Sequence, residues 1–150
     1  MPALVLFGCP AKTVNKNRGG ACLLDETETL YQIVKQTRAA VPEHIPVTAK
    51  IRLGYEDRNS YKDNAVALYE AGASEIVVHA RSKQDGYNPP AYWPCIADIK
   101  ALIPIPVIAN GEIWNLADFH QCRQESGCED VMLGRGLLAN PDLALAIKAE

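Results

Sequence analysis

The sequence has no long hydrophobic run, no excess of basic residues and no charged segment at its start. No apolar stretch approaches the roughly 20 residues that a membrane-spanning helix needs, and residues 1–7 lack the charged region that opens a secretory signal. We therefore expect a cytoplasmic protein with no membrane association. The formal net charge of −3 over 150 residues argues against a uniformly basic nucleic-acid-binding domain.

Paired cysteine motifs, linkers and low-complexity tracts are also missing. The 5 cysteines form no CxxC pair, and the 3 histidines do not stand at the spacing of zinc ligands. We expect free thiols in a reducing compartment, most of them buried as small apolar residues, and no metal site. A chain of 150 residues that is 48% hydrophobic can form one domain with a core of its own.

What the sequence does contain is a repeated pattern of a short apolar run followed by a polar or glycine-rich tip. The runs occupy residues 4–6, 46–49, 76–78, 107–109 and 131–133. The tips that follow them are Gly8-Cys9-Pro10, Lys50-Ile51-Arg52, His79-Ala80-Arg81, Asn110-Gly111-Glu112 and Gly134-Arg135-Gly136. Functional groups of parallel α/β enzymes gather where strands end, so this pattern predicts that the five tips share one face.

The segments between the apolar runs have helical spacing. Residues 25–28 and 60–63 resemble capping boxes, Gly72 and Gly127 suit the ends of helices, and residues 94–102 fit a short helix. Further helices are predicted to open at 115–118 and at 140–142, where Pro141 takes a first-turn position. The chain is therefore α/β with five parallel βα units. Two architectures remain open at this point: a complete doubly wound sheet, or part of a (β/α)8 barrel, which needs about 250 residues when whole.

Several tip residues are candidates for chemistry. The glycine tips at 110–112 and 134–136 let the backbone approach a phosphate, and Arg135 can add a charge-assisted contact. If these tips follow strands seven and eight of a barrel, they take its usual phosphate position, which favours the barrel. Lys50 interrupts an apolar strand, and His79 ends one. Either could bind a ligand or be structural. Cys9 could be buried or could donate a proton.

Seven cations follow the predicted strands and would form a phosphate-facing rim if the strands are parallel; each could also be an ordinary solvated charge. They are Lys12, Lys16, Arg18, Arg52, Arg81, Lys83 and Arg135. The longest irregular segment spans 82–94, where Tyr87, Tyr92 and Trp93 could pack or bind.

The ordered motifs closely resemble the tRNA-dihydrouridine synthases, particularly the C-type bacterial group. The likeness runs from about Phe7 to the end of the chain and rests on residues 8–15 (GCPAKTVN), 19–21 (GGA), 50–54 (KIRLG), 77–81 (VVHAR), 106–113 (PVIANGEI) and 132–136 (MLGRG).

The resemblance implies a flavoenzyme on a (β/α)8 barrel in which NADPH reduces FMN. The reduced flavin then gives hydride to C6 of a uracil base in tRNA, while an acid protonates C5. Cys9 matches the proton donor of the family. The residues that match the FMN-binding set are Lys50, His79, Asn110, Gly111, Glu112, Gly134 and Arg135. Arg52 and Arg81, and with them Lys12 and Arg18, are candidates for contacts with tRNA, whose target base must leave its stack.

The sequence departs from the family pattern in two ways. Leu6 stands where the family has asparagine. The chain also corresponds to barrel strands four to eight only, so the earlier strands and the C-terminal helical tRNA-binding domain are expected to be absent. Two alternatives to a catalytic domain therefore stay open. One is an inactive remnant or a half-barrel that self-associates through its exposed edges. The other is a different phosphate-binding barrel, a lyase or isomerase that uses Lys50 as a base or to form an imine.

Overall fold

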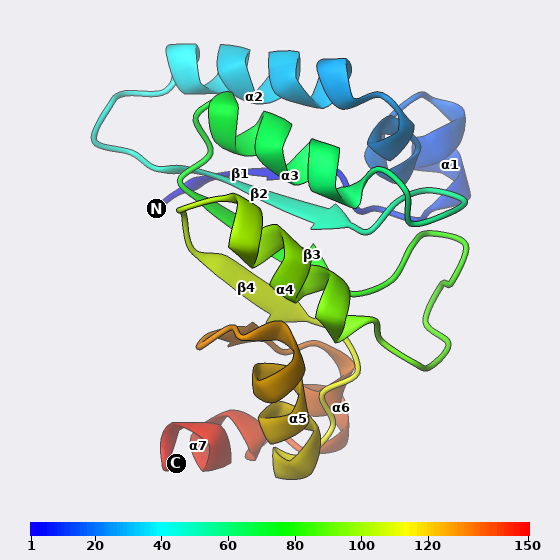
Figure 1. Ribbon diagram of the computed structural model, residues 1–150, viewed down its shortest axis with the longest axis vertical. Coiled ribbons are helices and arrows are strands. Elements are labelled where there is room, and N and C mark those ends of the chain that lie inside the picture. The colour runs from blue at the N-terminus through cyan, green and yellow to red at the C-terminus, as the bar shows by residue number, and fades with distance from the viewer.

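A computed structural model describes residues 1–150 as one parallel sheet covered by helices (Figure 1). The strands are β1 (Ala3–Leu6), β2 (Val47–Arg52), β3 (Glu75–His79), β4 (Val107–Asn110) and β5 (Val131–Met132). All four neighbouring pairs are parallel, and the five strands follow the order β1-β2-β3-β4-β5. The five predicted strands are thereby confirmed.

Helices connect every strand to the next. The long ones are α2 (Thr27–Ala40), α3 (Tyr61–Glu70), α4 (Trp93–Leu102) and α5 (Leu116–Ser126). Shorter turns are α1 (Lys12–Lys16), the 3-10 helix η1 (Gly20–Asp25), α6 (Arg135–Ala139) and α7 (Leu143–Lys148). None of the helices combines the length and the apolar character that crossing a bilayer would require.

The strand order decides between the two architectures. A doubly wound sheet reverses its strand order at a switch point, whereas these strands follow one another in sequence order without a reversal. In Figure 1, α3 and α4 lie over the same side of the sheet, and each long helix packs against the next along the chain. The fold is therefore a partial (β/α)8 barrel of five βα units.

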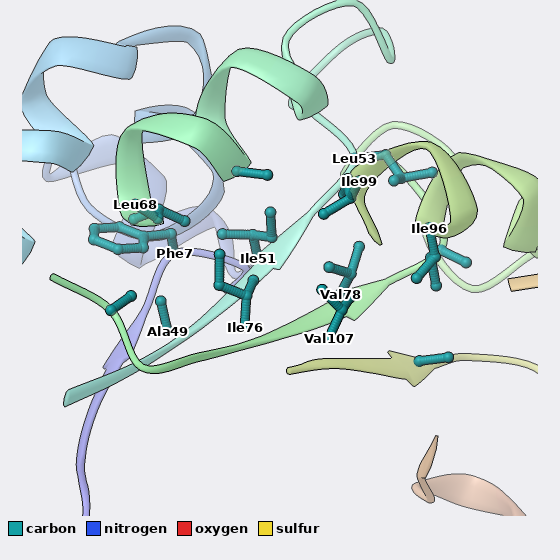
Figure 2. Packing of buried hydrophobic residues seen from close by; sticks show 14 of the residues in the cluster. Phe7, Ala49, Ile51, Leu53, Leu68, Ile76, Val78, Ile96, Ile99 and Val107 are labelled. Carbon is teal, nitrogen blue, oxygen red and sulfur yellow. The ribbon is translucent and has the colours of Figure 1, made fainter. Parts of the chain in front are cut away.

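The core lies between the sheet and these helices. Alternate strand residues point toward the helices, as β-strand geometry requires, and in Figure 2 Ala49 and Ile51 of β2 and Ile76 and Val78 of β3 converge there with Leu68 of α3. All five are fully buried. Each strand directs a row of apolar residues toward the helices. The residues between them in the sequence therefore point to the opposite face of the sheet.

The opposite face of the sheet, which would be the interior of a complete barrel, is partly open. Leu4 and Leu6 of β1 are 51% and 56% exposed, although they are large apolar side chains. Strand β1 pairs only with β2, so its outer edge has no neighbouring strand. This face of the sheet is therefore apolar and exposed at β1, and polar at the carboxyl ends of the strands, where the tips lie.

Strand register sets the order of residues on this face. Arg52 is opposite His79, His79 is opposite Asn110, and Asn110 is opposite Met132. One row lower, Leu6 is opposite Lys50. Residues from all five strands therefore lie in neighbouring positions on this face of the sheet, although they are far apart in sequence.

Two sequence expectations about helix starts were wrong in detail. Helix α3 starts after Ser60 as predicted, but the Ser60 hydroxyl donates to the Leu24 carbonyl 3.0 Å away and forms no cap. Helix α2 is preceded by Glu26, again without a side-chain cap. Helix α5 starts where the sequence predicted and has a side-chain cap, because Asn115 Oδ1 accepts from the Asp118 N–H at 2.9 Å.

Candidate active site

The carboxyl ends of the five strands surround one cavity of about 310 Å³, within the range of small-molecule sites. Most of the predicted site residues line it: Cys9, Lys50, Arg52, His79, Asn110, Gly111, Glu112, Gly134 and Arg135. Lys12, Arg18 and Arg81 are the candidates that do not. Leu6 lines the cavity too, so the position where the family has asparagine faces this space.

Lys50 of β2 lines the cavity, and its side chain is held by a residue of β4, two strands away. Its Nζ donates to Asn110 Oδ1 at 3.0 Å, which is its one hydrogen bond within the chain. Burial, assisted by the positive charge of Arg52, lowers the pKa of Lys50 to about 8. An ammonium has three N–H donors, so Lys50 can offer its remaining donors to an acceptor or an anion in the cavity.

His79 lies at the end of β3 and is buried. Burial is the main reason that its pKa falls to about 3, and the positive charges of Arg52, Lys50, Arg81 and Arg135 add to the shift. The ring is therefore neutral at physiological pH. Arg81 Nη1 lies 3.5 Å from His79 Nε2, which as the unprotonated nitrogen can accept from the guanidinium.

This neutral histidine predicts a specific loss of stability in acid. Below pH 6.5 the unfolded chain takes up a proton at His79, while the folded protein does not until pH approaches 3, so stability falls as pH decreases. Between pH 6 and 4 the free energy of unfolding of the wild type should fall faster than that of His79→Asn. The difference between the two slopes should be about 1.4 kcal/mol per pH unit. Urea denaturation at each pH measures this.

A matched control is His44→Asn, because His44 is exposed in the loop before β2. This variant should keep the pH slope of the wild type. Parallel curves for the wild type and His79→Asn would show that His79 does not titrate between the folded and unfolded states as described.

The Asn110-Gly111-Glu112 tip is held in place by the sheet and by α4. Asn110 Nδ2 donates to the Met132 carbonyl at 2.8 Å, and Trp93 Nε1 donates to the Gly111 carbonyl at 3.0 Å. Gly111 has a φ of +116°, and a Cβ there would come within 2.8 Å of the His79 ring. Only glycine fits this bend, so the tip approaches the histidine more closely than any other residue would permit.

A buried ion pair lies beneath this tip. The Arg81 side chain is 0% exposed, pairs with the Glu112 carboxylate and donates to the Asn88 carbonyl at 2.7 Å. Burial works against ionisation of Glu112, but hydrogen bonds from Arg81 and from Trp114 Nε1 outweigh it and hold the pKa of Glu112 below its usual range. Glu112 therefore stays charged and joins the loop after β3 to the loop after β4.

The structure buries Arg52 and Arg81, two of the seven cations predicted to form a phosphate-facing rim. Arg81 has no exposed surface. Arg52 is only 2% exposed, and its guanidinium donates to the carbonyls of Gly8, Ser82 and Gly86. Their charge is used inside the protein because neighbouring loops supply carbonyl and carboxylate acceptors. Arg52 still borders the cavity, whereas Arg81 only supports it.

The cavity lining contains two aromatic residues outside the predicted site set. Tyr87 and Trp114 line it, and the Arg135 guanidinium lies over both rings, at 4.8 and 5.0 Å from their centroids. The irregular 82–94 segment drew attention to Tyr87, but nothing in the sequence distinguished Trp114. The sequence could have indicated Trp114 only through its position two residues after Glu112.

The remaining candidates lie on or beside the loop after β1. Cys9 borders the cavity and is partly exposed. Lys12 and Lys16 are exposed on α1, and Arg18 is 84% exposed with a loose ion pair to Glu26 at 3.6 Å. These cations are free to contact an external partner. Of the other thiols, Cys122 and Cys128 are buried, whereas Cys22 and Cys95 are partly exposed, so fewer thiols are buried than the sequence predicted.

Comparisons with known proteins agree on a family. The family model described as "Dihydrouridine synthase (Dus)" matches residues 6–149. The chain is 57% identical over 142 residues to a "tRNA-dihydrouridine(16) synthase" of Shewanella oneidensis, covering 95% of this chain and 45% of the relative. Proteins of the same name from Pseudomonas syringae and Neisseria meningitidis serogroup B are 59% and 52% identical, again over 95% of this chain. The chain thus spans less than half the length of these relatives.

A solved structure supports the fold. The dihydrodipicolinate synthase family protein from Coccidioides immitis superposes with a TM-score of 0.62 over 82% of this chain and 39% of that chain. The sequence identity of 17% means that this likeness concerns architecture alone.

Proposed function

The chain belongs to the dihydrouridine synthase family, and from this premise we propose that it forms the FMN-binding catalytic part of an enzyme that reduces uridine to 5,6-dihydrouridine in tRNA. The observation that carries the proposal is the shared cavity. It brings a partly exposed thiol, Cys9, together with a cation that has free donors, Lys50, and a second cation, Arg135. A flavin reductase of uracil needs an acid and an anion site of this kind.

The residues of the cavity fit FMN. Lys50 has donors left for the acceptor atoms of a flavin ring. Gly134 has no atom within 4 Å of where a Cβ would lie, so the backbone beside Arg135 is open to a phosphate. In this proposal the cofactor is held by Lys50, His79, Asn110, Gly111, Glu112, Gly134 and Arg135. Bound FMN, reduced by NADPH, supplies hydride to C6 of the uracil ring.

The chain itself supplies the proton. Cys9 Sγ holds a proton at the cavity wall and donates it to C5 of the base, so that the C5–C6 double bond becomes a single bond. Water then restores the thiol. Neutral His79 cannot add positive charge beside Lys50, so Lys50, Arg52 and Arg135 are the cations of the cavity lining that attract an anionic ligand.

Exposed cations beside Cys9 fit the RNA backbone. Lys12, Lys16 and Arg18 lie on the segment that follows Cys9 and extend into solvent. Phosphate contacts of this kind position an RNA without reading its sequence. We place tRNA here as the partner, with the target base turned out of its stack into the cavity.

A second candidate function is self-association without turnover. The exposed Leu4 and Leu6 and the unpaired edge of β1 favour it, because open strand edges and apolar patches promote pairing with another chain. In this case two copies would cover each other's open sheet faces.

Flavin titration separates the two candidates. The purified chain should be yellow or should bind added FMN in a 1:1 ratio, with quenching of tryptophan fluorescence because Trp114 lines the cavity. Arg135→Ala should weaken FMN binding at least about tenfold, since a charge-assisted contact contributes about 1.5–3 kcal/mol. Lys148→Ala, a cation outside the cavity, is the matched control.

Light scattering on the same samples completes the test. A chain that neither retains nor takes up FMN, and that elutes as a dimer or larger assembly, would overturn the proposal and favour self-association. A flavin-loaded monomer would exclude the second candidate.

A further inference from the structure

We propose that Asn15 is the positioning residue for Cys9, acting through the backbone of the loop that holds the thiol at the cavity. The catalytic meaning of this assignment rests on the proposed function. Its structural content does not, because it concerns how three separate points of the chain are tied together by one amide side chain.

Asn15 makes hydrogen bonds in both directions. Its Nδ2 donates to the Cys9 carbonyl at 3.0 Å and to the Ala11 carbonyl at 2.8 Å. Its Oδ1 accepts from the Cys22 N–H at 2.7 Å. Both N–H donors and the carbonyl oxygen of the amide are therefore used, and each contact reaches a different part of the loop.

The Cys9 carbonyl is the centre of this arrangement. Besides Asn15, it accepts from the Ala21 N–H at 3.0 Å. Gly20 lies so close that a Cβ there would come within 2.7 Å of the same oxygen. Glycine at 20 lets η1 approach, and Asn15 then fastens α1 and η1 to the residue that carries the thiol.

Local sequence leaves Cys9 little other support. It lies after β1 and between Gly8, which has no side chain, and Pro10, which has no N–H. Helix α1 is only 5 residues long and has no buried residue, so packing cannot fix this segment. Arg52 holds the Gly8 carbonyl before Cys9, and the Asn15 amide holds the carbonyl of Cys9 itself. Loss of the amide hydrogen bonds would shift the thiol, and a small displacement of an acid is enough to slow proton transfer greatly.

The five free cysteines make the proposal directly measurable. Alkylation by iodoacetamide, followed by peptide mass spectrometry, gives a rate for each thiol of the purified chain. In Asn15→Ala, Cys9 and Cys22 should react about tenfold faster, because each loses a hydrogen bond that holds its backbone. Cys122 and Cys128 are buried and report whether the whole fold has loosened.

The isosteric variant Asn15→Asp separates the two directions of hydrogen bonding. A carboxylate still accepts from the Cys22 N–H but cannot donate to the Cys9 carbonyl. Cys9 should then react about tenfold faster, as in the alanine variant, while Cys22 keeps its original rate. Asn17→Ala is the matched control, because Asn17 is exposed at the end of α1 and its side chain makes no hydrogen bond; it should leave every rate unchanged.

Catalytic rates supply the second readout. In flavin-loaded protein, Asn15→Asp should slow uridine reduction at least about tenfold, while FMN affinity and flavin reduction by NADPH stay unchanged. A rise in the rates of Cys122 and Cys128 in step with Cys9, or no rise at Cys9, would overturn the proposal. A chain that lacks flavin and turnover but shows the selective rise at Cys9 would refute the proposed function and leave the assignment of Asn15 intact.

Discussion

Replacing Cys9 with alanine is expected to lower the rate of uridine reduction by about 10²–10⁴-fold, the usual contribution of a positioned acid. FMN binding should not change, because the groups that fit the flavin lie on β2 to β5 and their tips and not on the loop after β1. Dihydrouridine in tRNA, measured by mass spectrometry of nucleosides, gives the rate, and the flavin absorbance spectrum gives the occupancy.

Cys95→Ala is the control for this substitution. Cys95 is also a partly exposed free thiol, but it lies on α4 and does not line the cavity. Its loss should leave both readouts unchanged. If Cys9→Ala kept a rate within tenfold of the wild type, the proton would have to come from another group, and the role proposed for Cys9 would be lost.

Replacing Glu112 with leucine is expected to reduce the free energy of unfolding by about 3–5 kcal/mol, the cost of leaving a buried charge without its partner. The stranded group is the guanidinium of Arg81, whose side chain has no exposed surface. Such a loss is a large part of the about 5–15 kcal/mol that stabilises a typical domain. Urea denaturation followed by tryptophan fluorescence measures it.

Two further variants make this result interpretable. Glu112→Gln keeps an acceptor for Arg81 and should cost less than the leucine variant. Glu43→Leu removes an exposed carboxylate that has no ion pair and should change stability by less than about 0.5 kcal/mol. A loss below about 1 kcal/mol in Glu112→Leu would mean that water reaches Arg81 and that the pair is not buried in solution.

The strands and the shared cavity were predictable because two simple regularities indicate them. Apolar runs covered on both faces mark parallel strands, and parallel strands end at the same edge of a sheet. Cys9, Lys50 and Arg135 could therefore be placed together from their positions after such runs. The order of the strands, in contrast, came from the family resemblance, since five βα units alone fit a doubly wound sheet equally well.

The errors of the sequence analysis share a physical cause. Whether Arg81 faces solvent depends on Glu112 and on the Asn88 carbonyl, which come from elsewhere in the chain. Ser60 caps nothing because the Leu24 carbonyl competes for its hydroxyl. Trp114 joins the cavity through Glu112 and Arg135. Such contacts between distant segments leave no periodic signal in the sequence.

The register across β2, β3 and β4 determines where the chain can change in length. Arg52, His79 and Asn110 lie opposite one another, and each is one residue away from a buried core residue of its strand. Deleting one residue inside β3 would turn His79 toward the helices and an isoleucine or valine toward the cavity. Added residues after Ser82 leave these pairings unchanged. Natural and laboratory variants should therefore tolerate insertions and deletions in the connections beyond the site tips, but none within the strands.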